Sequence, residues 1–349
     1  MLVASLTSRS LDRERAITTM ANLSLRVCCL VATLSLGYAH VALAQSSLFY
    51  LEAQGVAGYS SALEKAIYYS MAPGDPMQKP SVGFDYIQRL SGAARDYGNV
   101  ALQLRLAYNQ DSDRDVELQV FNAYLRYKAG VANIWIGHDR PALGLSSYFD
   151  THGLLLPTLA MMGYGFDRDW GMGLARDFDW GGLALSATTG SGMRIDFEGN
   201  YLAAARISKG VLEQENYTIG LSGAYGDILE TMGYDLLSPE PVSFHMGAVD
   251  LAYVWARYEN RIEFMAGERA NESSYAVSWR FGLNLLAESR LKLEAEPMVT
   301  KLMGDSSFML SAGVSYQVTA DLAVRSMYQY IDETDDNRIL AQVYYYRRI

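Results

Sequence analysis

The sequence of 349 residues predicts an all-β protein, a transmembrane antiparallel β-barrel of about 16 strands. Three features lead to this prediction. Long segments alternate apolar and polar residues with a period of two, tyrosines recur near the ends of these segments, and short connections alternate with long ones along the chain. In addition, charged residues make up only 19% of the chain, against about 25% in a typical soluble domain.

Period-two alternation is clear in the segment 275–285. Tyr275, Val277 and Trp279 lie on one face of this segment, and Ser278 and Arg280 lie on the other. One face is therefore apolar along its whole length, while the other carries a charge at mid-strand. This pattern fits a barrel with hydrocarbon outside and water inside, and also a soluble sandwich with wet outer faces. Strand lengths of about ten residues and tyrosines at the strand ends favour the barrel.

Sixteen segments of the chain show the strand pattern. They are 48–59, 82–91, 99–109, 116–127, 131–137, 168–178, 182–189, 200–208, 215–226, 244–256, 260–267, 274–285, 289–299, 307–318, 321–331 and 337–348. Two of them, 82–91 and 244–256, alternate poorly, so a count of about 14 also fits.

The connections between these segments sort by length. Those that follow even-numbered strands are mostly short, at 128–130, 179–181, 257–259, 286–288 and 319–320. Several that follow odd-numbered strands are long, at 60–81, 138–167, 190–199 and 227–243. Outer-membrane barrels have short periplasmic turns and long extracellular loops, so this sorting supports the barrel independently of the alternation.

Residues 1–44 are expected to be a secretory signal that precedes a barrel at 45–349. Arg26 comes just before a ten-residue apolar run, 27–36, and Ala42-Leu43-Ala44 offers a small-residue cleavage site. The run is too short for a membrane-spanning helix, which needs about 20 residues, so the alternative is a buried hydrophobic helix. Met20 would give a compact signal by itself and is a second candidate start.

Composition argues against several other classes of protein. The formal net charge is −10 and the chain has no run of Lys or Arg, so no nucleic-acid partner is expected. Both cysteines, Cys28 and Cys29, lie in the expected signal, which leaves no disulfide framework or cysteine metal site for the rest of the chain. Histidine spacing and glycine patterns suggest neither a metal site nor a cofactor site. No metal, cofactor or catalytic activity is therefore expected.

The stretch 117–144, ELQVFNAYLRYKAGVANIWIGHDRPALG, resembles a segment of the Gram-negative porins of the 16-stranded superfamily. In those proteins a strand with an Ala-Tyr pair leads through a short turn to a strand that ends in Gly, and a Pro and a Gly follow. The corresponding residues here are Ala123-Tyr124, the turn Lys128-Ala129-Gly130, the strand end Ile134-Trp135-Ile136-Gly137, Pro141 and Gly144.

This resemblance implies an outer-membrane homotrimer in which the loop after the fifth strand, 138–167, folds into the barrel and narrows the pore. Porins often set acidic residues of this loop against a basic wall. By resemblance, the acidic residues on the loop side are Asp139, Asp150 and Asp167, and Arg105 and Arg126 are the best candidates for the facing wall.

The residues themselves favour passive diffusion of small hydrophilic solutes or ions, because sixteen strands leave an aqueous channel. The polar faces of the strands supply the expected pore wall, which consists of Arg105, Arg126, Arg206, Arg280, Arg290, Lys292, Glu294 and Arg325. Arginine suits carboxylate and phosphate groups, so small organic acids are one expected solute class. The alternative role for these charges is to brace the lumen by pairing with one another.

Two other function classes stay open at this point. An outer-membrane lipid hydrolase would need a serine and a histidine on the outer face, and Ser243 and His245 share a face without an obvious third partner. A periplasmic or surface β-sandwich that binds a ligand without a membrane would also show alternating strands.

Overall fold

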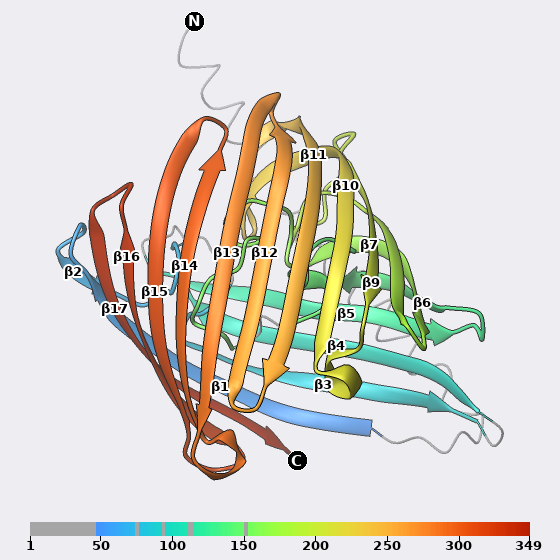
Figure 1. Ribbon diagram of the computed structural model, residues 1–349, viewed down its shortest axis with the longest axis horizontal. Coiled ribbons are helices and arrows are strands. Elements are labelled where there is room, and N and C mark those ends of the chain that lie inside the picture. The colour runs from blue at the N-terminus through green and yellow to red at the C-terminus, as the bar shows by residue number, and fades with distance from the viewer. Residues whose placement is uncertain (1–46, 74–76, 93–94, 111–114, 150–152) are drawn as a thin grey trace, which may run out of the picture. The chain divides into compact units, whose positions relative to one another are not determined.

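The protein is almost entirely β-structure, as Figure 1 shows. The computed structural model describes residues 47–73, 77–92, 95–110, 115–149 and 153–349. The expected signal at 1–44 and the loop residue Asp150 lie outside these described residues. None of the helices in the described part of the chain has the length and apolarity that a membrane-spanning helix requires.

Sixteen strands of the described chain form the wall of the barrel. They are β1 (Ser47–Ser60), β3 (Ser81–Ser91), β4 (Asp96–Tyr108), β5 (Val116–Lys128), β6 (Asn133–Asp139), β7 (Asp169–Phe178), β8 (Gly181–Thr188), β9 (Tyr201–Lys209), β10 (Tyr217–Met232), β11 (Asp235–Trp255), β12 (Tyr258–Arg269), β13 (Glu272–Leu285), β14 (Leu291–Leu302), β15 (Asp305–Gln317), β16 (Leu322–Ile331) and β17 (Asp336–Arg348). Each predicted segment overlaps one of these strands. A short additional strand, β2 (Lys65–Ile67), pairs with the end of β1.

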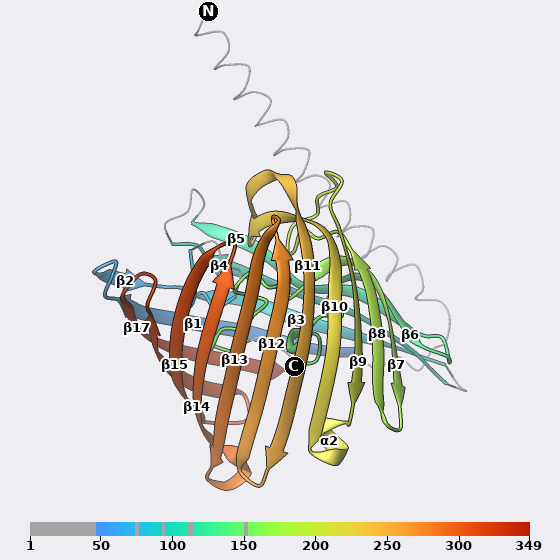
Figure 2. The same ribbon diagram turned by 45° about the horizontal axis from the view of Figure 1, so that its top comes forward.

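The sheet closes on itself because the last strand pairs with the first. β17 runs antiparallel to β1 from the pair Tyr50–Arg348 to the pair Ser60–Arg338. On its other side β1 pairs with β3, and the two ends of the sheet run side by side in Figures 1 and 2. A single closed sheet has no second layer to stack against, so the β-sandwich alternative is wrong.

The two faces of the wall have the polarity expected of a barrel in hydrocarbon. On β13 the outward side chains Tyr275, Val277 and Trp279 are each more than 40% exposed, while Ser278 and Arg280 are buried on the inner side. The outer surface of a soluble protein would carry the charges instead. Because the lipid tails offer no hydrogen bonds, the closed ladder that pairs the backbone also suits this environment.

Aromatic side chains mark both ends of the apolar outer band. At the short-turn end Trp255 stacks on Tyr258, with ring centroids 5.9 Å apart. Toward the long-loop end Tyr201 lies next to Tyr225, which in turn stacks on His245 at 4.6 Å. Amphipathic rings favour the two membrane–water interfaces, so these groups fix the level at which the barrel sits in a bilayer.

One of the predicted long connections is wrong. Residues 227–243 belong mostly to β10 and β11, which extend to a two-residue turn at Gly233 and Tyr234. The hairpin stays paired through two register shifts between Ile228 and Thr231. Proline lacks an amide donor and is tolerated where a bulge disturbs the ladder, so β11 continues through Pro239 and Pro241.

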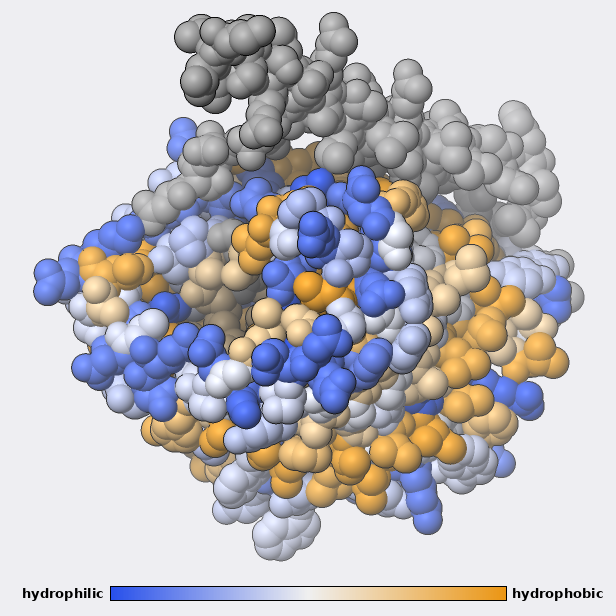
Figure 3. Space-filling model, turned by 90° about the horizontal axis from the view of Figure 1, so that it is seen from above, coloured by the Kyte–Doolittle hydropathy of each residue, from blue (hydrophilic) through white to orange (hydrophobic). Residues whose placement is uncertain are grey.

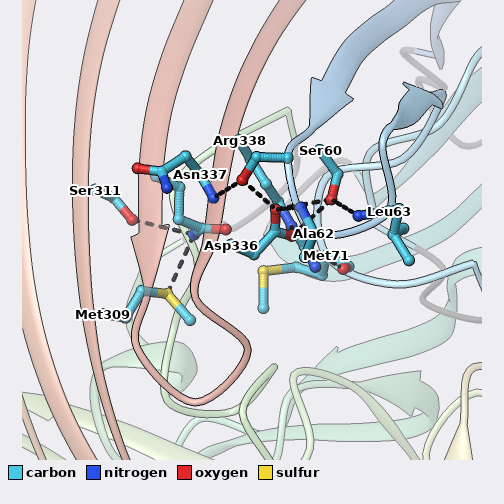
Figure 4. Close-up of polar contacts among 11 residues, drawn as sticks. Ser60, Ala62, Leu63, Met71, Met309, Ser311, Asp336, Asn337 and Arg338 are labelled. Atoms are coloured by element: carbon cyan, nitrogen blue, oxygen red, sulfur yellow. Dashed lines mark hydrogen bonds and ion pairs between the residues drawn. The ribbon is translucent and has the colours of Figure 1, made fainter.

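A buried carboxylate joins the long-loop ends of β1 and β17. The Asp336 side chain accepts a hydrogen bond from Ser60 Oγ at 2.8 Å and another from the Ala62 amide at 3.0 Å. It also pairs with Arg338 Nε at 2.5 Å, as Figure 4 shows. Asp336 is only 1% exposed, so these contacts replace its hydration and hold the closing strands together.

We predict that Asp336→Asn destabilises the barrel by about 2–4 kcal/mol, because the amide loses the charge facing Arg338 and one of its two acceptor oxygens. The measurement is the free energy of unfolding in urea, followed by tryptophan fluorescence in lipid vesicles. Asp335→Asn in the neighbouring exposed turn is the matched control and should change stability by less than about 0.5 kcal/mol. Equal effects of the two substitutions would contradict the role given to Asp336.

Candidate functional site

The connection between β6 and β7 runs along the inner side of the barrel wall. β6 is the fifth strand of the wall, so this is the loop that the sequence places at 138–167. Three of its backbone amides donate to inward-pointing side chains of β8, β10 and β12. These contacts are Ala142 N to Ser186 Oγ (3.0 Å), Gly144 N to Ser222 Oγ (2.9 Å) and Leu145 N to Glu263 Oε1 (2.6 Å).

Gly144 allows the loop to lie this close to the wall. It has φ of 59° and precedes the 3₁₀ helix η1 (Leu145–Ser147). A Cβ atom at position 144 would overlap the carboxylate of Glu263 and the side chain of Met265. Only glycine therefore combines this positive φ with the close approach. The Glu263 carboxylate then accepts the first amide of η1, which has no partner within the helix.

The loop descends from η1 toward the short-turn end of the barrel. Tyr148 donates its hydroxyl hydrogen to Glu213 Oε2 at 3.0 Å, and Glu213 belongs to α2 (Leu212–Glu215), the helical turn between β9 and β10. The guanidinium carbon of Arg261 lies 3.7 Å from the centroid of the Phe149 ring. The loop thus reaches deep into the barrel, and aromatic contacts with the wall accompany its hydrogen bonds.

The returning half of the loop is fixed by three further hydrogen bonds. They are Arg280 Nη2 to Pro157 O (2.6 Å), Arg269 Nη1 to Gly163 O (2.7 Å) and Tyr164 Oη to Tyr275 O (2.8 Å). Loop residues such as Leu159 and Tyr164 also pack with inward methionines of the wall, among them Met265 and Met298. Through these contacts the loop packs against the inner surface from β8 to β15.

The sequence predicted that Arg105 faces the passage, but in the structure it does not. Its Nη2 lies 2.6 Å from Glu52 Oε1, and both side chains are fully buried. Its guanidinium also lies 4.1 Å from the centroid of the Phe121 ring and donates to the backbone oxygen of Met77 at 3.4 Å. Arg105 braces β4 against β1, which is the alternative role that the sequence left open.

Arg126 lies near one of the three predicted acids, Asp139. Arg126 Nη2 is 2.8 Å from Asp139 Oδ2, so these two groups form an ion pair instead of facing each other across a passage. Asp139 ends β6 and is not part of the loop. Asp167 pairs with its neighbour Arg168. Asp150 lies outside the described residues.

The other predicted wall residues split into two groups. Arg206, Arg280, Lys292, Glu294 and Arg325 point inward. Their contacts are Arg206 with Asp250 (2.5 Å), Arg280 with Glu296 (2.8 Å), Lys292 with Glu259 (2.9 Å) and Glu294 (3.1 Å), and Arg325 with Gln342 (2.9 Å). Arg290 was placed wrongly, because it precedes β14 and donates to Gln317 O and Val318 O at the exposed short-turn rim.

The acids that pair with these cations were not predicted from the sequence. Glu52, Asp250 and Glu296 are all buried on the inner face, as is Glu263. Their positions on the polar face of an alternating strand were the available signal. Which cation each acid meets depends on the sheet: Arg206 on β9 reaches across β10 to Asp250 on β11.

Ser243 and His245, the pair named for a hydrolase, have separate partners in the structure. Ser243 Oγ donates to Asn271 Oδ1 at 3.3 Å, while the His245 ring stacks on Tyr225. These contacts engage Ser243 and His245 separately, on the outer face of β11. Among the described residues no group of three or more His, Cys, Asp or Glu side chains is arranged to hold a metal ion.

We predict that Glu263→Ala frees the start of η1 from the wall, because the Leu145 amide loses a charged acceptor. Hydrogen exchange in a peptide covering 140–149 should become about tenfold to a hundredfold faster, which corresponds to the loss of about 1.4–3 kcal/mol. Glu263→Gln keeps an acceptor oxygen and should have a smaller effect. Glu268→Ala, on the same strand but exposed outside, serves as the control and should leave the loop unchanged.

No family model and no curated protein matches this chain, but solved structures do. The OmpT protein of Vibrio cholerae, with loop L8 deleted, superposes with a TM-score of 0.60 at 14% identity, over 87% of this chain and 100% of that one. An anion-selective porin from Comamonas acidovorans gives 0.60 at 8% identity, over 87% and 100% of the two chains. OmpF of Salmonella typhi, in complex with daunomycin, gives 0.61 at 11%, over 87% and 97%.

Identities this low establish the fold alone. The neighbours are outer-membrane barrels, and the wall of this chain combines a closed antiparallel ladder with an apolar outer face and a charged inner face. Such a surface is stable only where hydrocarbon surrounds it. The chain is therefore an outer-membrane protein with the closed, 16-stranded β-barrel fold of the porins.

Proposed function

We propose that the protein is a porin through which small hydrophilic solutes or ions diffuse passively. The observation that carries this proposal is the inner face of the wall, where charged side chains point inward from β1, β5, β9, β12, β13, β14 and β16. A barrel of sixteen strands is wider than its own side chains can fill, so a polar interior retains water. Figure 3 shows the face seen from above hollowed beside its centre, with hydrophilic residues on the rim.

The loop after β6 narrows this lumen from one side. It packs against β8 to β15, and through Leu155 and Leu156 it also reaches β16 and β17. Where it returns to β7, Arg168 donates to Asn122 on β5. Arg126 on β5 keeps 39% of its side chain exposed, whereas Arg206 and Arg280 beneath the loop are almost fully buried. Arg126 is thus the predicted wall cation that solutes meet most directly.

The charge arrangement favours a general diffusion pore over a site for organic acids. Arg206 binds both oxygens of Asp250, and Arg280 binds Glu296. A guanidinium engaged in this way has few donors left for a passing carboxylate. The small-organic-acid expectation therefore receives no support from these two arginines, and selection by size and local charge is the simpler mechanism.

The assembly proposed for the protein is a homotrimer, exported with the help of a signal at residues 1–44. One of the similar solved structures is a trimer form of OmpT from Vibrio cholerae. We propose no catalytic activity. Gel mobility of detergent-extracted protein tests the assembly: unboiled samples should run as a trimer and boiled samples as a monomer.

Conductance of the purified protein in planar bilayers tests the channel. We predict stepwise openings that grow with salt concentration, because ions cross a wet lumen. A protein that shows the folded-barrel mobility on gels but gives no openings in repeated insertions would overturn the proposed function.

We predict that Arg126→Gln shifts selectivity toward cations by about twofold in the permeability ratio, because Asp139 loses its partner and stays charged at the passage. The measurement is the reversal potential in a salt gradient. Arg176→Gln is the control, since Arg176 is exposed on β7 at a position paired with the outward residue Leu183. A shift of the same size in the control would contradict the assignment of Arg126.

A further inference from the structure

We propose that a second segment of the chain narrows the lumen next to the β6–β7 loop. It is the connection between β2 and β3, described at residues 68–73 and 77–80 and called here the 68–80 segment. The sequence placed these residues in an outer loop at 60–81. The inference rests on the proposed pore function, because it names a further element that sets the size of the passage.

Five described residues of the 68–80 segment are buried inside the barrel. Tyr69, Ser70, Met77, Gln78 and Lys79 are each less than 5% exposed. Lysine and glutamine are rarely this buried unless they are held by partners. Lys79 donates to Asn109 at the end of β4, so its charge is solvated by the protein.

Three inward-pointing side chains, two on β17 and one on β4, hold the segment. The contacts are Arg338 Nη1 to Met71 O (2.7 Å), Gln342 Nε2 to Gln78 Oε1 (3.0 Å) and Arg105 Nη1 to Met77 O (3.4 Å). Figure 4 shows the first of these, with Arg338 also bound to Asp336. Arg338 lies near the long-loop end of β17, and Gln342 lies four residues further along the strand. The segment therefore extends from the rim toward the middle of the barrel.

The segment also covers part of the charged wall. Glu52, Gln103 and Arg105 all point inward, yet each is 3% exposed or less. Met77 binds Arg105 directly, and Gln103 donates to Glu52 at 3.2 Å. Arg126, on the strand next to Arg105, keeps 39% of its side chain exposed. Arg105 lies beneath the segment, whereas Arg126 is level with Asn99, six positions nearer the short-turn end of β4.

The two inward elements meet in an apolar cluster. Ile67 at the end of β2 and Tyr69 pack with Leu155 and Leu156 of the β6–β7 loop, and the wall contributes Val56, Met327 and Leu340. Apolar contacts inside an otherwise charged lumen exclude water from this place. Where this cluster lies beside β16, β17 and β1, the two elements together fill the lumen next to the wall.

A short deletion can remove the segment without disturbing the strands. The Ser70 amide donates to Gln78 O at 3.0 Å, so residues 70 and 78 lie as close as partners in a ladder. Replacing 71–77 by Gly-Gly should rejoin them without strain. We expect single-channel conductance to rise about twofold, because conductance through a wet pore grows with its open cross-section.

Thiol labelling gives a second readout that does not depend on conductance. In a chain with Cys28 and Cys29 replaced by serine, Gln103→Cys should react at least about tenfold more slowly with a water-soluble thiol reagent than Arg126→Cys, because the segment covers position 103. In the shortened chain the two positions should react at similar rates. Val277→Cys, which faces lipid, should stay unlabelled in both chains and controls for unfolding.

The outcomes separate the two proposals. Higher conductance together with faster labelling at position 103 supports the second narrowing element. Unchanged conductance in the shortened chain, or rapid labelling of Gln103→Cys in the full-length chain, overturns it and leaves the porin function standing. If neither chain conducts while both are folded, the porin function fails, and the same labelling comparison still decides whether the segment covers the wall. If the shortened chain does not fold, the labelling rates in the full-length chain decide alone.

Discussion

The closed hydrogen-bonded ladder is the constraint on which the rest of the structure depends. In hydrocarbon an unpaired backbone amide costs several kcal/mol, so a sheet can cross a membrane only without free edges. Here the pairing of β1 with both β17 and β3 removes the edges. The buried Asp336, bound to Ser60 and Arg338, strengthens this closure at the long-loop end.

Closure also dictates what the interior must do. Alternating side chains give every strand an inward face, and sixteen strands enclose more space than those side chains fill. Paired charges, such as Arg206 with Asp250, and two stretches of backbone that fold inside occupy part of this space. A buried pair is costly to separate, because removing one partner leaves the other charge without water. The arginines of the wall therefore serve chiefly to hold structure, and few stay exposed.

The β6–β7 loop shows how such a backbone is accommodated. Several of its amides and carbonyls bond to side chains of the wall, including Glu263 and Arg280, since the described loop residues form no strand. Gly144 supplies the positive φ and the absence of a side chain that the contact with Glu263 requires. The conformation of the loop thus depends on the wall, although Gly144 and Glu263 are more than a hundred positions apart in the sequence.

The sequence by itself determined the strands and their faces. Alternation is a local property, so Tyr275, Val277 and Trp279 could be assigned to one side without knowing their neighbours, and the structure places them outside. Only the tertiary structure decided that Arg105 is buried and that Arg126 is partly exposed. Both are inward residues of adjacent strands, but one is covered by a segment whose path depends on contacts with β17 and with the other loop. Such coverage arises from packing between distant parts of the chain, which no local pattern records.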